Sequence, residues 1–173
     1  MSKKLWESLF IALAIWGCVH SKGPPFDDGR IFLIVDEKVD RRLIGHEGAI
    51  GIVTEVEGYE PFELYVIDHS SFENPYWVES LRRRGLSRSN TLDLTTNRGK
   101  KIEITRRFLP DGTLSEGMLV PGGTEVTVTV RVSPWSHVRV LSRRLRIDGD
   151  AVFRLYPAST EEYMPNFVLE RVL

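Results

Sequence analysis

Residues 124–132 read TEVTVTVRV, and this stretch decides the fold class. Valine occupies every even position from Val126 to Val132, whereas the odd positions from Glu125 to Arg131 carry charged or hydroxyl side chains. Because successive side chains of a strand point to opposite faces, this alternation predicts a strand with one buried face. Pro121-Gly122-Gly123 directly before it predicts a turn at its start.

Alternating runs elsewhere in the chain predict further strands, which are residues 31–39, 49–57, 62–68, 91–95, 101–108, 137–147, 151–156 and 167–173. Turn signals separate them: Asn97-Arg98-Gly99 predicts a hairpin between two strands, and Pro110-Asp111-Gly112 and Asp148-Gly149 predict tight turns. This pattern predicts a mainly β fold, an antiparallel β-sandwich of the immunoglobulin-like or transthyretin-like kind. A closed barrel is the alternative architecture.

The run at residues 137–147 changes its phase. Val138 and Val140 share one parity, whereas Leu145 and Ile147 share the other. One extra residue in a strand restores the facing of its side chains, so we expect a bulge near Leu141-Ser142.

One short helix is predicted to interrupt the strands. Asn74 suits its N-cap, Pro75 its first position and Gly85 its C-terminal end. Within it, three- and four-residue spacing predicts a buried face made of Trp77, Val78 and Leu81. A shorter helical turn is expected from Ser159 to Pro165.

The amino-terminal segment has the order of an export signal. Lys3 and Lys4 precede the apolar run Leu9–Ile15, and Cys18, the only cysteine of the chain, follows it. The apolar run through Val19 has eleven residues, against about 20 needed to cross a bilayer, so an uncleaved membrane anchor is not favoured. A signal peptide cut elsewhere, without lipidation, is the main alternative.

Ile15-Trp16-Gly17-Cys18 resembles the lipobox of bacterial lipoproteins. The resemblance implies cleavage after Gly17 and attachment of acyl chains, such as palmitate, to Cys18. It divides the chain into a signal peptide (1–17), a lipidated cysteine with a tether (18–29) and a single β-sandwich domain (30–173). Val19 stands where an aspartate would imply inner-membrane retention in this class. The resemblance therefore implies a cell-envelope protein on the outer membrane, facing the periplasm.

Composition narrows the partner classes. The chain carries 23 basic and 24 acidic residues, a net charge of −1. Nucleic-acid binding needs a strong positive field, so this balance argues against that partner. The lipid bilayer, through acylated Cys18, and an envelope protein are the expected partners.

The search for catalytic or metal chemistry finds no convincing site. His69 lies between Asp68 and Ser70, but neighbours on an extended chain point to opposite faces and cannot form a catalytic relay. The four histidines are dispersed, and Asp148-Gly149-Asp150 fits a tight turn better than a calcium loop. A cluster of carboxylates fits a solvated face better than a glycosidase pair; its members are Glu55, Glu57, Glu60 and Glu63. We therefore predict no catalytic residue, metal or cofactor.

Aromatic and arginine side chains gather around the predicted helix. Such residues are enriched at protein interfaces, so they are candidates for partner binding: Tyr76, Trp77, Arg82, Arg83 and Arg88. A helix end with core aromatics explains the same residues without a partner. Trp135, in the loop Ser133–Ser136, is a further candidate, either exposed for a ligand or closing the end of the sandwich.

These observations favour a membrane-anchored, non-enzymatic lipoprotein that binds another envelope protein as an accessory or assembly component. The layout of strand Phe62–Asp68, the helix after it and Pro121-Gly122 is loosely similar to the outer-membrane lipoprotein of type VI secretion systems. The alternatives are a small-molecule or glycan-binding module that uses Trp135 or Tyr76 for stacking, and a hydrolase with a dispersed site.

Overall fold

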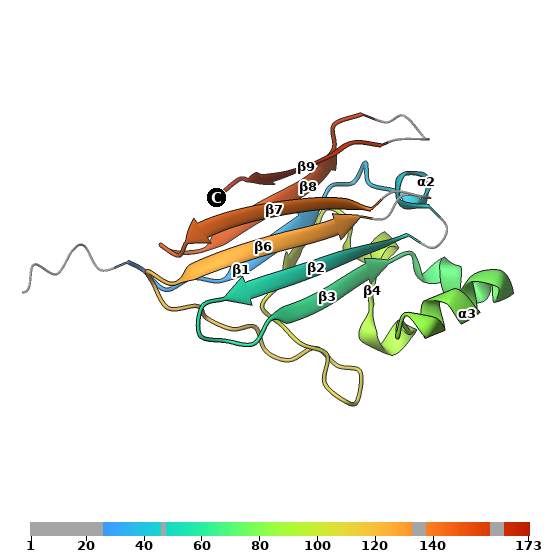
Figure 1. Cartoon of the computed structure of the whole chain (residues 1–173), viewed down its shortest axis with the longest axis horizontal. Coiled ribbons are helices and arrows are strands. Elements are labelled where there is room, and N and C mark those ends of the chain that lie inside the picture. The colour runs from blue at the N-terminus through green and yellow to red at the C-terminus, as the bar shows by residue number, and fades with distance from the viewer. Residues whose placement is uncertain (1–25, 46–47, 133–137, 160–164) are drawn as a thin grey trace, which may run out of the picture.

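The strands form two sheets that pack face to face (Figure 1). The structure is a computed structural model that describes residues 26–45, 48–132, 138–159 and 165–173. One sheet has the order β5-β1-β8-β9 and the other the order β4-β3-β2-β6-β7. The strands are β1 (Ile31–Val35), β2 (Ala49–Val56), β3 (Phe62–Ile67), β4 (Leu92–Asp93), β5 (Lys101–Glu103), β6 (Glu125–Val132), β7 (Arg139–Arg146), β8 (Ala151–Pro157) and β9 (Phe167–Arg171). The predicted mainly β sandwich is confirmed.

Strand β6 has the facing that its valines predict. All four valines from Val126 to Val132 are buried, and the odd-numbered residues face outward. At its start Gly123 has a φ of 83° and donates to Ile147 O at 2.8 Å, while Ile147 N donates to Thr124 O at 2.9 Å. This is the glycine bulge that increases local twist, and it fixes the register of β6 against β7.

Two strand pairings differ from the antiparallel expectation. β1 runs parallel to β8, with Ile31 opposite Ala151, and β4 runs parallel to the end of β3. The remaining pairings are antiparallel. Parallel strands need a long connection, so the paired segments lie far apart in the sequence. No local sequence pattern therefore predicts which strands pair in parallel.

The predicted bulge in β7 is wrong. The register of β7 against β6 is one-to-one from Val132↔Arg139 to Glu125↔Arg146. Leu141 and Leu145 therefore face the core, whereas Val138 and Val140 remain exposed, at 62% and 57%. The phase change reflects apolar residues on the outer face of an edge strand.

The predicted hairpin at Asn97-Arg98-Gly99 is also wrong. Residues Leu94–Asn97 form a short helix, α4, and the strands before and after it, β4 and β5, belong to different sheets. Gly99 does adopt a positive φ of 71°, but its N–H donates to Val35 O of β1. Gly99 therefore lies in the connection that passes from one sheet to the other.

The predicted helix is confirmed as α3 (Pro75–Arg83). The Asn74 side chain accepts from Tyr76 N at 3.0 Å, and Gly85 follows the helix with a φ of 73°. Of the expected buried face, Leu81 is buried, Trp77 is half-buried and Val78 is 37% exposed.

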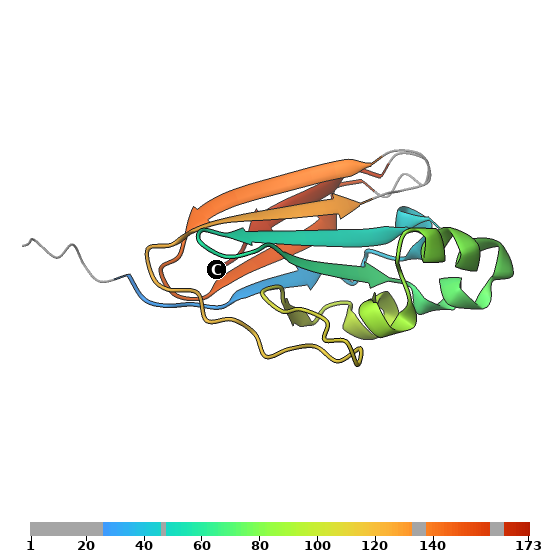
Figure 2. The ribbon, with the colours of Figure 1, turned by 60° about the horizontal axis from the view of Figure 1, so that its bottom comes forward.

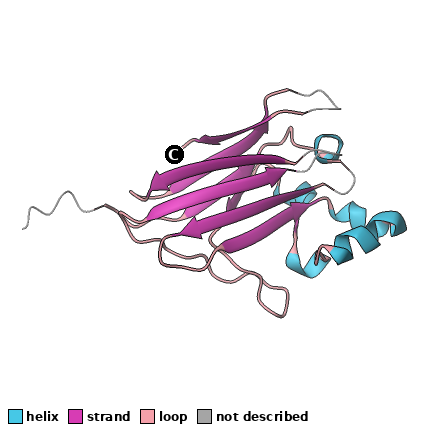
Figure 3. Ribbon diagram, in the orientation of Figure 1, coloured by secondary structure: helices cyan, strands magenta, loops and turns pink. Residues whose placement is uncertain are grey.

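Besides α4, three short helical segments were not predicted: α2 (Arg41–Ile44), η1 (His69–Glu73) and η2 (Arg88–Asn90). Asp40 caps α2 by accepting from Arg42 N and Leu43 N. The turn expected from Ser159 falls largely on residues 160–164, outside the described part of the chain. The helices gather at one end of the molecule (Figure 3).

One large core fills the space between the sheets. It takes buried side chains from both layers, among them Leu33 and Phe153 of one sheet and Ile52 and Val130 of the other. A second, small cluster lies on the outer face of the five-stranded sheet beneath α3, and its members are Ala49, Ile67, Leu81 and Leu86. The helix is therefore attached where β2 begins and β3 ends, at one end of the sheet (Figure 2).

Folded contacts begin before the expected boundary at residue 30. Asp28 Oδ1 accepts from Gly122 N at 2.7 Å, and Asp148 Oδ1 accepts from Asp27 N at 3.3 Å. The Arg146 guanidinium lies 5.8 Å from the centre of the Phe26 ring. Residues 26–29 thus pack on the end of the sandwich instead of extending the tether.

Candidate functional site

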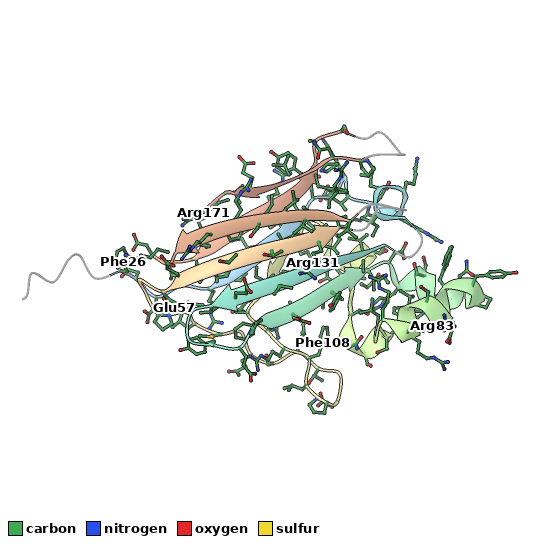
Figure 4. All side chains as sticks on the ribbon, viewed as in Figure 1. Phe26, Glu57, Arg83, Phe108, Arg131 and Arg171 are labelled. Atoms are coloured by element: carbon green, nitrogen blue, oxygen red, sulfur yellow. The ribbon has the colours of Figure 1, made fainter. Side chains whose placement is uncertain are left out.

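A shallow groove of about 280 Å³ lies on the outer face of the five-stranded sheet, beside the C-terminal end of α3. Its lining combines apolar side chains with two arginines and a glutamate; the residues are Ala49, Gly51, Val53, Glu63, Tyr65, Arg84, Leu86, Arg131 and Val138. We refer to it as the sheet-face groove. Strands β2, β3 and β6 form its floor, and Arg131 is labelled on β6 in Figure 4.

Pairing across the sheet explains how the groove is shaped. Gly51 of β2 lies opposite Tyr65 of β3 on one side and Arg131 of β6 on the other. A Cβ at Gly51 would approach the Tyr65 ring to 3.3 Å, so the ring lies over the glycine. The missing side chain therefore makes room for the Tyr65 ring on the floor of the groove.

Strand β7 extends this apolar surface. Val140 pairs with Arg131 across the β6–β7 ladder, which places its side chain on the same outer face as the groove. Val138, which lines the groove, and Val140 are both more than half exposed. Exposed apolar side chains that continue a groove and are flanked by charge are typical of interaction surfaces.

The predicted partner-binding residues of α3 lie near the groove but do not line it. Tyr76 is 85% exposed and Trp77 is half-buried. Arg82 and Arg83 both pair with Glu79, at 2.7 and 3.2 Å. Their positive charge is thus partly compensated within the helix.

Arg88 contacts the loop beneath α3. Its guanidinium pairs with Glu73 at 3.1 Å and reaches His69 O at 3.5 Å. It therefore links the segment after α3 to the segment before it. Arg84 belongs to the arginine group Arg82–Arg84 that the sequence points to, and it does line the groove. Leu86, which also lines the groove, was not predicted as a site residue.

Two further predicted residues cannot be placed. Cys18, the expected lipid-attachment site, and Trp135, the loop tryptophan, lie outside the described residues. Their roles remain predictions from the sequence.

A second groove, of about 430 Å³, lies on the outer side of the four-stranded sheet. It is lined by Ile34, Asp36, Glu37, Lys38, Gly99, Arg154 and Val172. This lining is mainly charged and carries no aromatic side chain among those residues, unlike a site that stacks glycans.

The buried carboxylate of this second groove already has partners. Burial opposes the charged form of Asp36, but a hydrogen bond from Lys38 N and the Arg154 guanidinium outweigh it, so the pKa of Asp36 is below its usual value. Arg154 donates through Nε at 2.9 Å and also through Nη2. The ion pair joins the end of β1 to β8, and its role is structural.

His69 and its neighbours contact different partners. Asp68 Oδ1 accepts from Ser70 N at 2.9 Å as the cap of η1, and His69 Nε2 lies 2.9 Å from Thr91 Oγ1. Among the described residues, no group of three histidine or carboxylate side chains is arranged to hold a metal ion. In the same part of the chain, no helix has the length and hydropathy to span a membrane.

Neither the protein-family models, nor the curated proteins, nor the solved structures contain a match to this chain. The proposals below therefore depend on its own sequence and geometry.

Sequence reasoning did not find the sheet-face groove. A signal for it was present, because the parity of Val138 and Val140 conflicts with that of Leu145, but we interpreted the conflict as a bulge. Gly51, between Ile50 and Ile52, was a second signal, since an isolated glycine in a strand often marks the close approach of another group.

Proposed function

We propose that this protein is a lipid-anchored, non-enzymatic component of a bacterial cell envelope that binds another protein through the sheet-face groove and the adjoining face of β7. The anchor part rests on the lipobox-like sequence at Cys18. The binding part rests on one observation, which is the apolar outer face formed by Val138, Val140 and the groove.

The character of this surface favours a protein over a small ligand. Its groove has a volume of about 280 Å³, at the lower limit of the roughly 300–1,000 Å³ of common ligand pockets. Its lining combines apolar and aromatic side chains with Arg84, Arg131 and Glu63, and protein interfaces also combine apolar and polar side chains. Arginine beside aromatic residues is also the composition of binding hot spots.

The non-enzymatic part is supported by how the chemically capable groups are used. Asp36 is held by Arg154 and Lys38, and His69 by Thr91. A catalytic acid or base needs access to a substrate proton, and these groups instead support the fold.

Mass spectrometry of the full chain, expressed in a bacterium that processes lipoproteins, tests the anchor. We expect a mature chain that begins at Cys18 and carries acyl chains. Two or three chains bind a bilayer far more stably than one. A Cys18→Ser variant should leave the membrane fraction. Retention of residues 1–17, or an unmodified thiol at the mature terminus, would contradict the proposal.

Site-specific photo-crosslinking in the cell of origin tests the binding surface. A crosslinking amino acid at Val140 should capture a discrete protein, whereas one at Leu119, which is similarly exposed at 52%, should not. Identical crosslinked products from both positions would contradict a specific binding surface, because they would show that Val140 captures any protein that is nearby.

A further inference from the structure

Strand β7 is an exposed edge with an unusual charge. Its sequence RVLSRRLR contains four arginines and no acidic residue, and most of its side chains are exposed. It pairs with β6 on one side and ends the five-stranded sheet (Figure 2). Part of β7 also lies near β9 of the other sheet, to which it is not paired. Its register is uninterrupted over eight residues, which is long for an edge strand.

The backbone groups that face this edge follow from the ladder. Ile147 N donates to Thr124 O, and bonded pairs in an antiparallel ladder alternate, so the odd-numbered residues of β7 bond to β6. Residues Val140, Ser142 and Arg144 then direct their N–H and C=O groups outward. The Ser142 carbonyl agrees with this, because it accepts from Arg143 Nη1 at 3.0 Å, a side-chain donor.

We propose that β7 accepts an acidic, extended segment of a partner protein as an additional strand. The proposal rests on the protein-binding role above and names the chemistry of the partner. Strand addition supplies main-chain hydrogen bonds along the unpaired edge. Acidic side chains of the added strand supply charge complementary to the exposed Arg139 and Arg143, which share the face of β7 that carries Leu141 and Leu145.

Charge also separates this partner from other occupants. A second copy of β7 would bring its own four arginines to the edge, and like charges on paired strands are destabilising. An anionic lipid surface is disfavoured because the end of the sandwich that receives Phe26 carries exposed carboxylates, namely Asp27, Asp28, Asp148 and Asp150.

Peptide binding to the full chain in nonionic detergent tests the proposal. The probe is an eight-residue peptide of alternating glutamate and valine. The first control contains lysine in place of glutamate, and the second keeps the glutamates but has prolines that block strand pairing. We expect only the probe to bind, and hydrogen exchange to slow at the amides of Val140, Ser142 and Arg144.

Two variants separate the contributions of charge and backbone. The pair Arg139→Glu and Arg143→Glu should weaken the probe at least about tenfold, and Ser142→Pro, which removes an outward N–H, should do the same. Lys101→Glu on β5, an exposed position of another edge strand, should have no effect. Thermal unfolding of each variant establishes whether it is folded. If the Ser142→Pro variant is not folded, the Arg139→Glu and Arg143→Glu variant still tests the proposal.

Several results would overturn the proposal. The first is equal binding of the proline peptide. The second is slowed exchange of the same amides when phosphatidylglycerol is added to the detergent micelles, but not when the probe is added. The third is a dimer that protects the edge without the probe. Because the probe does not use the sheet-face groove, failure here leaves the crosslinking result at Val140 intact, and the two proposals fail separately.

Discussion

At the scale of single residues, the buried side chain of Thr54 on β2 is out of keeping with the core around it. It is fully buried, and its Oγ1 has no hydrogen-bond partner in the described part of the chain. A buried hydroxyl without a partner keeps its desolvation cost. Thr54 therefore represents a local stability deficit.

Replacing Thr54 with the isosteric valine should raise the free energy of unfolding by about 1–2 kcal/mol, because the unpaired hydroxyl is removed without a cavity. Urea unfolding measures this difference. Thr127→Val, at a half-exposed position of β6, is the control and should change little. Destabilisation by Thr54→Val would mean that the hydroxyl has a partner, such as a buried water.

Asp36 is the residue at which stability should depend on pH. Its pKa is lowered in the folded protein, so its contribution is present above the unfolded value, near 3.9, and is lost as the pH falls through the folded value. Asp36→Asn should cost about 1–3 kcal/mol at pH 7, and this cost should shrink below about pH 4.

Unfolding of both proteins between pH 7 and pH 3 checks this prediction. Arg154→Gln should cost less in the Asp36→Asn background than in the parent, because the ion pair is already broken. A cost of Asp36→Asn that does not change with pH would contradict the assignment.

At the scale of elements, the Asn74 cap fixes where α3 begins. Asn74→Ala removes the acceptor for Tyr76 N and should cost about 1 kcal/mol, whereas Asn74→Asp keeps an acceptor and should cost much less. Chemical unfolding compares the two. Equal effects of alanine and aspartate would show that packing of Leu81, and not the cap, holds the helix.

Strands β6 and β7 are neighbours of equal length, but the buried face can be predicted from sequence only for β6. In β6 every apolar residue is on the core face, so its parity predicts its burial. In β7 apolar residues occupy both faces. It is the last strand of the sheet, so its side chains are only partly covered by β6 and the core. Sequence parity alone could not say which of the two sets is exposed.

At the scale of the whole molecule, the two ends of the sandwich differ. Phe26, where the described chain begins, lies at one end, and Arg83 of α3 lies at the other (Figure 4). If Cys18 is the lipid site, residues 18–25 span at most about 25–30 Å. The anchored protein would then present α3 away from the bilayer, with β7 running between the two ends (Figure 1).

Closure of the sandwich should depend on the C-terminal strand. Leu169 of β9 is fully buried and belongs to the main core, so Leu169→Ala should cost about 2–5 kcal/mol. Val140→Ala on exposed β7 should stay within about 0.5 kcal/mol. Thermal or urea unfolding provides both values, and a similar cost at the two positions would contradict the burial described here.

The sequence by itself determined the features that depend on near neighbours. The alternation of Val126–Val132, the Asn74 cap and the positive-φ turns at Gly112 and Gly149 follow from side-chain period and backbone sterics. These forces act within a few residues, so a linear pattern is enough to predict them.

Tertiary structure decided which surfaces meet. It placed β4 and β5 in different layers, paired β1 in parallel with β8, joined Asp36 to Arg154, and left the outer face of β7 uncovered. The candidate site belongs to this second class. Burial of a residue on an edge strand depends on what other segments lie against it, and those segments are distant in the chain.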